Sequence, residues 1–196
     1  MSVEKQWENL LTPAVMQERM IAVSLYITAY EMLKESIIGR LKDFYCIGFD
    51  SDGTTTSPDY DLKVLNLHKR KSPLYASLLW LTNIGAIVQE DKEVLEQLKE
   101  LRNSLAHEMP EIVLAGKDLA LTEKMQGVMN LIRKVEVWWI VNVELETDPD
   151  YDGRDVNPDE ITPGPILMMQ IMMMVLSGDE KLKEHYNDSK PTSTEL

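Results

Sequence analysis

The sequence has few of the residues that cross-link or interrupt a fold. Cysteine occurs once, at Cys46, so no disulfide can form within the chain, and a reducing compartment such as the cytoplasm is expected. Glycine and proline occur nine times each in 196 residues, which favours long helices over a loop-rich domain. His68 and His185 have no cysteine or histidine at zinc-ligand spacing, so neither a metal nor another cofactor is expected.

Long apolar runs are also missing. The longest, residues 165–176, is too short to span a bilayer and contains Gln170. The N-terminus has neither the basic nor the apolar region of an export signal. These features predict a cytoplasmic protein that does not associate with a membrane.

Positive charge is scarce. Twenty Lys and Arg stand against 33 Asp and Glu, which gives a net charge of −13. Proteins that hold nucleic acid tightly normally present a basic surface. Either a local basic patch serves a transient encounter, therefore, or nucleic acid is not the ligand. The best basic patch is His68-Lys69-Arg70-Lys71.

What the sequence does have is helical periodicity over most of its length. Apolar residues at spacings of three and four predict helices over 13–45, from Pro73, over about 91–109 and over 121–145. Short connections between them indicate an all-α antiparallel helical bundle over residues 1–146.

The connections carry further expectations. Residues 46–60 are predicted to form a loop because they are rich in turn residues, and residues 61–70 to form a short helix. Gly85 is expected to lie within the helix that starts at Pro73 and to allow close helix approach. Of Trp138 and Trp139, one is expected in the core and one at an interface.

Residues 147–196 form a second region: an acidic loop, a Met-rich helix over 162–177 and a polar tail. Flexible methionine side chains adapt to irregular surfaces. The helix therefore either packs onto a partner or second protomer, or caps the open end of the bundle. Its methionines are Met168, Met169, Met172, Met173 and Met174.

The acidic loop resembles the start of an EF-hand calcium loop at Asp148, Asp150 and Asp152. The twelfth position, however, is Asp159 rather than a bidentate glutamate, and Asp155 stands where an apolar residue is usual. An acidic surface loop is favoured over weak cation binding. If the loop does bind calcium, the protein could be a calcium-responsive regulator.

The most informative stretch is Leu101-Arg102-Asn103-Ser104-Leu105-Ala106-His107-Glu108, at the end of the helix over about 91–109. Its apolar stripe is predicted to comprise Val94, Leu98, Leu101 and Leu105. At about 100° per residue, Arg102 lies at the edge of this stripe, while Asn103 and His107 share a face that points away from it.

An arginine, a polar residue, a short gap and a histidine resemble the signature of HEPN domains (higher eukaryotes and prokaryotes nucleotide-binding). The resemblance extends loosely to the helical layout of residues 13–146. It implies a bundle that pairs into a homodimer and cleaves RNA without a metal, as a toxin or phage-defence effector that an antitoxin restrains. In one toxin subgroup a tyrosine follows two residues after the histidine; here that position is Met109, so this regulatory pairing is unsupported.

The implied catalytic residues are Arg102, Asn103 and His107. An imidazole can take a proton from the 2′-hydroxyl or give one to the leaving oxygen, while arginine neutralises the phosphate oxygens. One histidine cannot do both on opposite sides of phosphorus, but a twofold dimer supplies two.

A purely structural role of this motif also remains open. Arg102 could instead pair with Glu31, Glu100 or Glu108 while His107 caps the helix end. The chain would then be a HEPN-like interaction module, whose acidic surface and Met-rich helix bind a protein partner.

Overall fold

The structure is a computed structural model that describes residues 2–51, 53–108 and 121–178. Helices dominate these residues, so the predicted all-α class is confirmed. The expectations for Met109 and for the polar tail after Gly178 lie outside the described residues.

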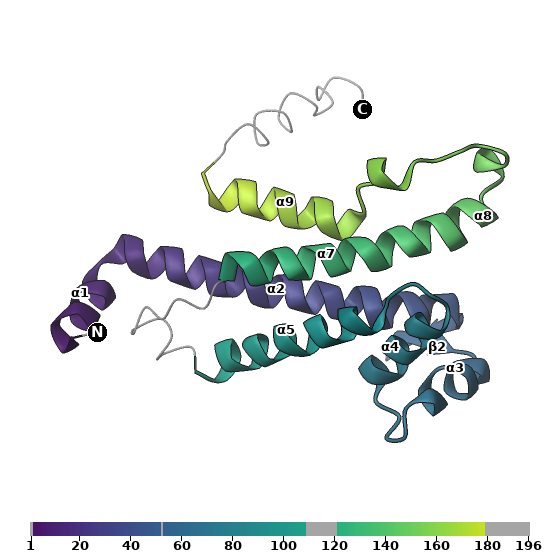
Figure 1. Cartoon of the computed structure of the whole chain (residues 1–196), viewed down its shortest axis with the longest axis horizontal. Helices are drawn as coiled ribbons and strands as arrows, with labels where there is room; N and C mark the ends of the chain where they lie inside the picture. Colours follow the sequence, from purple (N-terminus) through teal and green to yellow (C-terminus); the bar gives the residue numbers. More distant parts are fainter. Residues whose placement is uncertain (1, 52, 109–120, 179–196) are drawn as a thin grey trace.

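Three long helices build the body of the protein (Figure 1). They are α2 (Pro13–Phe44), α5 (Gln89–His107) and α7 (Leu121–Trp139). A π-helical turn, Ile140–Glu144, continues α7 into the short α8 (Leu145–Thr147). The predicted helices over 13–45 and 121–145 therefore match the structure closely.

The helices do not all run in opposite directions. Arg40 near the end of α2 pairs with Glu136 near the end of α7, so these two neighbours are parallel. Lys124 contacts Gln97 and Lys134 contacts Asp91, so α5 and α7 are antiparallel. Between α2 and α7 the chain forms a hairpin and short helices at the end of α2. Helix α5 then returns it to the end at which α2 starts, so α7 runs in the same direction as α2.

Helix α2 begins where the sequence indicates, at the Thr12-Pro13 step, because proline suits the first helical turn. Its buried side chains recur every three or four residues along one side. They include Val23, Tyr26, Tyr30, Leu33, Ile37 and Leu41. The Tyr26 hydroxyl donates to the Leu98 carbonyl oxygen at 2.9 Å, which ties α2 to α5.

The predicted loop over residues 46–60 is wrong. Strands β1 (Cys46–Asp50) and β2 (Gly53–Thr56) form an antiparallel hairpin there. The three threonines of β2 are β-branched and favour extended backbone, whereas Gly53, with φ +117°, allows the tight turn. Turn residues thus marked a hairpin rather than an unstructured loop.

Short helices follow the hairpin. They are α3 (Pro58–Lys63), the 3₁₀ turn η1 (Leu65–Leu67) and α4 (Pro73–Asn83). The single short helix expected over 61–70 is therefore replaced by α3, which starts three residues earlier, and by η1 within the expected range. Gly85 does not lie within α4: the helix ends at Asn83, and Gly85 makes the following turn with φ +77°.

Helix α9 (Gly164–Leu176) lies against α2 and α7. Figure 1 shows it on the opposite side of these helices from α5. Ile166 and Met169 are buried in the contact. Before it come the 3₁₀ turns η3 (Pro149–Tyr151) and η4 (Pro158–Glu160), and the Arg133 guanidinium holds the latter through the carbonyl oxygens of Pro158 and Asp159, at 3.0 Å each.

The two ends of the body differ in packing. At one end, α1 (Val3–Leu11) extends from the start of α2 and has no buried residue. At the other, the rings of Trp80 and Trp139 stack at 5.9 Å. Trp139 is buried and Trp138 half-buried, so the core position predicted for one tryptophan is confirmed. Among the described residues, no helix is long and apolar enough to cross a membrane.

Candidate functional site

The site predicted from the sequence lies on the last two turns of α5. This helix packs on the rest of the protein through Leu95, Leu98 and Leu105, which are all buried. The expected inward position of Val94 is wrong: it is 38% exposed and Leu95 is buried instead, whereas Leu98 and Leu105 are buried as expected. The correction leaves Arg102 at the edge of the packed side.

Arg102 is fixed by Glu31 of α2. Its Nε and Nη2 atoms donate to the same carboxylate oxygen, at 3.1 and 2.6 Å. Both side chains are about one-third exposed. Lys34 donates to the other carboxylate oxygen at 3.1 Å. Glu31, one of the three carboxylates considered for Arg102, is therefore the partner.

The electrostatics of Glu31 follow from these contacts. Burial raises its pKa, but hydrogen bonds from Lys34 and Arg102 and their positive charges outweigh burial, so the pKa lies below its ordinary value. The carboxylate is therefore charged at neutral pH and holds the guanidinium in one position. Nη1 takes no part in this ion pair.

Asn103 and His107 are exposed and lie four residues apart on one face, as predicted. The helix ends at His107, and the backbone N–H of Glu108 donates to the Ser104 carbonyl oxygen at 2.7 Å. His107 is therefore the last residue of α5, and its side chain is exposed at the end of the helix.

Lys99 is a neighbour that the sequence reasoning missed. It stands four residues before Asn103, which places it on nearly the same face of α5 and could have revealed it. Its Nζ donates to the hydroxyl of Tyr75 in α4, lies 4.7 Å from the centre of that ring, and pairs with Glu96 at 3.4 Å. Lys99 therefore connects the motif helix to α4.

Tyr30 of α2 faces this same cluster and is buried. Burial raises the pKa of Tyr30 above its ordinary value. The positive charges of Lys99 and Arg102 lower this pKa, and the negative charges of Glu31 and Glu96 raise it further. The Tyr30 hydroxyl therefore stays protonated at neutral pH, when it can donate a hydrogen bond but cannot act as a base.

The predicted basic patch is exposed at Lys69, Arg70 and Lys71, in the turn between η1 and α4. The His68 ring lies beside that of Tyr75, with 5.4 Å between their centres. Because Tyr75 also contacts Lys99, the patch and the motif helix are linked through α4.

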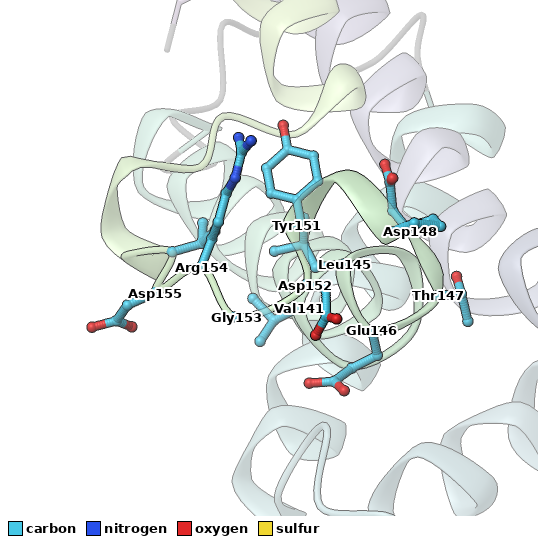
Figure 2. A pocket seen from close by; sticks show the side chains of 12 residues that line it. Val141, Leu145, Glu146, Thr147, Asp148, Tyr151, Asp152, Gly153, Arg154 and Asp155 are labelled. Atoms are coloured by element: carbon cyan, nitrogen blue, oxygen red, sulfur yellow. The ribbon is translucent and has the colours of Figure 1, made fainter.

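The carboxylates of the acidic loop are spread around a pocket. The pocket has a volume of about 530 Å³, and the labelled carboxylates of Asp148, Asp152 and Asp155 point in different directions (Figure 2). One oxygen of Asp148 accepts from the backbone N–H of Asp150 at 3.0 Å. In the described part of the chain, no three His, Cys, Asp or Glu side chains are grouped to hold a metal ion.

Comparison with known proteins adds no further evidence on this site. No family model, no curated protein and no solved structure matches the chain. Evidence for a function therefore comes from the geometry of α5 and its neighbours.

Proposed function

We propose that the protein is a metal-independent endoribonuclease of HEPN type whose reacting groups are Arg102, Asn103 and His107. The observation that supports this best is the exposed pair of Asn103 and His107 beside a guanidinium that Glu31 holds in place. A histidine can exchange protons near neutral pH, and a fixed arginine can stabilise charge that builds on a phosphate.

The proposed reaction uses the RNA itself as nucleophile. One His107 removes the proton from a 2′-hydroxyl, whose oxygen attacks phosphorus, while a second His107 protonates the departing 5′-oxygen. The products are a 2′,3′-cyclic phosphate and a free 5′-hydroxyl. Arg102 neutralises the non-bridging oxygens, and Asn103 orients the phosphate or the imidazole.

Two histidines require two chains. We therefore propose a homodimer that brings the ends of two α5 helices together in the cytoplasm. A toxin or phage-defence role, with an antitoxin or another protein as restraining partner, is part of the same proposal.

The test is RNA cleavage in EDTA. We expect wild type to cut single-stranded RNA, and His107→Ala and Arg102→Ala to lose about 100-fold or more in rate. Arg154→Ala, at the exposed acidic loop, is the matched control and should cut normally. A substrate with 2′-deoxyribose at the cut position should resist. No cleavage by wild type across pH 5–9, or full activity in both variants, would overturn the proposal.

A second candidate function is a protein-interaction module centred on α9. Its exposed side chains are uncharged and, apart from Gln170, apolar; Leu167, Met168 and Val175 are 49, 51 and 58% exposed. We propose a second copy of the chain as its occupant: copies of a protein with net charge −13 repel one another least through an uncharged face. An α9 dimer would place the two motifs on its outer sides.

A further inference from the structure

A pocket lies between α4 and the first half of α5, outside the proposed reacting groups. Its volume is about 290 Å³, near the lower limit of small-molecule sites. The side chains of His68, Tyr75, Leu78 and Leu79 form one wall, and Lys92, Glu93 and Glu96 of α5 form the other. The pocket is therefore small, flanked by aromatic rings and bordered by charge.

The aromatic wall has a fixed arrangement. His68 Nδ1 accepts from the Ser72 backbone N–H at 3.1 Å, which leaves Nε2 as the protonated, donating nitrogen of the neutral ring. The Tyr75 ring lies beside His68 and is anchored by Lys99. Flat rings next to aliphatic side chains suit a flat, partly apolar ligand.

The opposite wall offers polar groups. The carboxylates of Glu93 and Glu96 can accept hydrogen bonds from exocyclic amino groups, which adenine, guanine and cytosine all carry. Lys92 can donate to a carbonyl oxygen. A nucleobase has this combination of a flat apolar face and an edge of donors and acceptors.

A basic stretch adjoins the aromatic wall in the sequence. The exposed residues Lys69, Arg70 and Lys71 directly follow His68, in a chain that is acidic overall. Base-stacking rings beside a basic stretch are the usual means by which proteins hold single-stranded nucleic acid.

The pocket and the motif share one face of α5. Glu96 precedes Asn103 by seven residues, about two turns, and His107 by eleven, about three turns, so all three point in nearly the same direction. The rise from Glu96 to His107 is about 16 Å. A strand of a few nucleotides laid along this face would reach from the pocket to the histidine.

We propose that this pocket binds one nucleobase of a single-stranded RNA while Lys69, Arg70 and Lys71 contact its phosphates. The inference rests on the proposed function, because it assigns a substrate-binding position to the same α5 face. It adds a base subsite about three helical turns from the reacting groups.

The experiment measures binding apart from cleavage. Fluorescence anisotropy with a labelled single-stranded RNA, uncleavable because it carries 2′-O-methyl riboses, gives the affinity of the full chain. His68→Asn keeps an acceptor for Ser72 but removes the ring, and is expected to weaken binding about five-fold or more. Wild type should bind an oligonucleotide with one abasic position about as weakly as His68→Asn binds the intact oligonucleotide. With His68→Asn, the abasic position should weaken binding little further.

The basic stretch is tested by salt dependence. Lys69→Gln/Arg70→Gln should weaken binding and lower the slope of log affinity against log salt by about 1.4, since each single-strand phosphate contact contributes about 0.7. Lys42→Gln/Lys63→Gln, at exposed sites elsewhere, is the matched control. Equal affinity in all variants, or indifference to the abasic position, would overturn the inference.

The outcomes separate the two proposals. If RNA binding depends on His68 but wild type does not cleave ordinary RNA, the base subsite is supported and the nuclease proposal fails. If wild type cleaves RNA but substitutions of His68 and the basic stretch leave binding unchanged, the nuclease proposal is supported and the base subsite fails. Melting temperatures equal to wild type show that the variants fold.

Discussion

Arg40 and Glu136 face each other across α2 and α7, although 96 residues separate them in the sequence. Glu136 is only 2% exposed, and one of its oxygens accepts from Arg40 Nε and Nη2 at 3.0 and 2.5 Å. Arg40 Nη1 also reaches Glu144 at 2.6 Å. The hydrogen bond to Glu136 raises the pKa of Arg40 more than burial lowers it. This ion pair joins the C-terminal parts of the two parallel helices.

The first prediction concerns this pair. Arg40→Met should reduce the free energy of unfolding by about 3–5 kcal/mol, because it leaves a buried carboxylate without its counter-charge. Urea denaturation followed by circular dichroism measures the loss. Arg40→Met/Glu136→Met should recover most of it, since no unpaired charge remains. A double variant less stable than Arg40→Met would contradict this account.

The sequence revealed the helices better than their arrangement. The apolar periodicity of α2 and α7 located both, because each buries one continuous side. The parallel alignment of these two helices was not foreseeable from local pattern, since it depends on contacts such as Arg40–Glu136. The hairpin over residues 46–56 was missed because turn residues alone do not tell a loop from a strand pair.

The second prediction is a pH dependence at Glu31. Its pKa lies below the ordinary value, so the ion pair contributes stability above the unfolded pKa and loses it as pH falls. Wild type should be more stable than Glu31→Gln at pH 7, by less than about 1 kcal/mol because the site is partly solvated. The difference should vanish between about pH 5 and pH 3.

Urea denaturation at several pH values measures this difference. Glu100→Gln, on the exposed side of α5, is the control and should follow wild type throughout. A gap between wild type and Glu31→Gln that widens as the pH falls would refute the assignment.

The third prediction concerns the turn after α4. Gly85 has φ +77°, where a side chain strains the backbone, yet no atom lies within 4 Å of the position a Cβ would take. Gly85→Ala should therefore lower the free energy of unfolding by about 1 kcal/mol, through backbone strain alone. Gly48→Ala, at a position equally open but without positive φ, should be nearly neutral. Thermal or urea unfolding compares them, and equal losses would contradict the explanation.

The candidate site was predictable only in part. The exposed face of Asn103 and His107 follows from helical geometry, which depends on residues close in sequence. The partner of Arg102 was one of three possibilities, because Glu31 lies 71 residues away and only the packing of α2 on α5 selects it. The link from Lys99 to Tyr75 needed the position of α4, which no local pattern supplies.

The last prediction decides how two copies meet. The nuclease needs the ends of two α5 helices close together, whereas the interaction module pairs α9, on the opposite side of α2 and α7. One symmetric contact between two chains cannot use both faces. The single Cys46 makes a direct test simple, since Cys46→Ser gives a background without cysteine.

Two exposed positions report on the two faces: Asn103→Cys on α5 and Met168→Cys on α9. Under mild oxidation a disulfide forms only where Cα atoms of two chains come within about 7 Å, and a short bismaleimide extends that reach. We expect Asn103→Cys to give covalent dimers on non-reducing gels and Lys63→Cys, an exposed control, to give none. Dimers from Met168→Cys alone would place the two His107 side chains on opposite outer faces, where they could not act on one phosphate. That result would reject the nuclease proposal and support the interaction module.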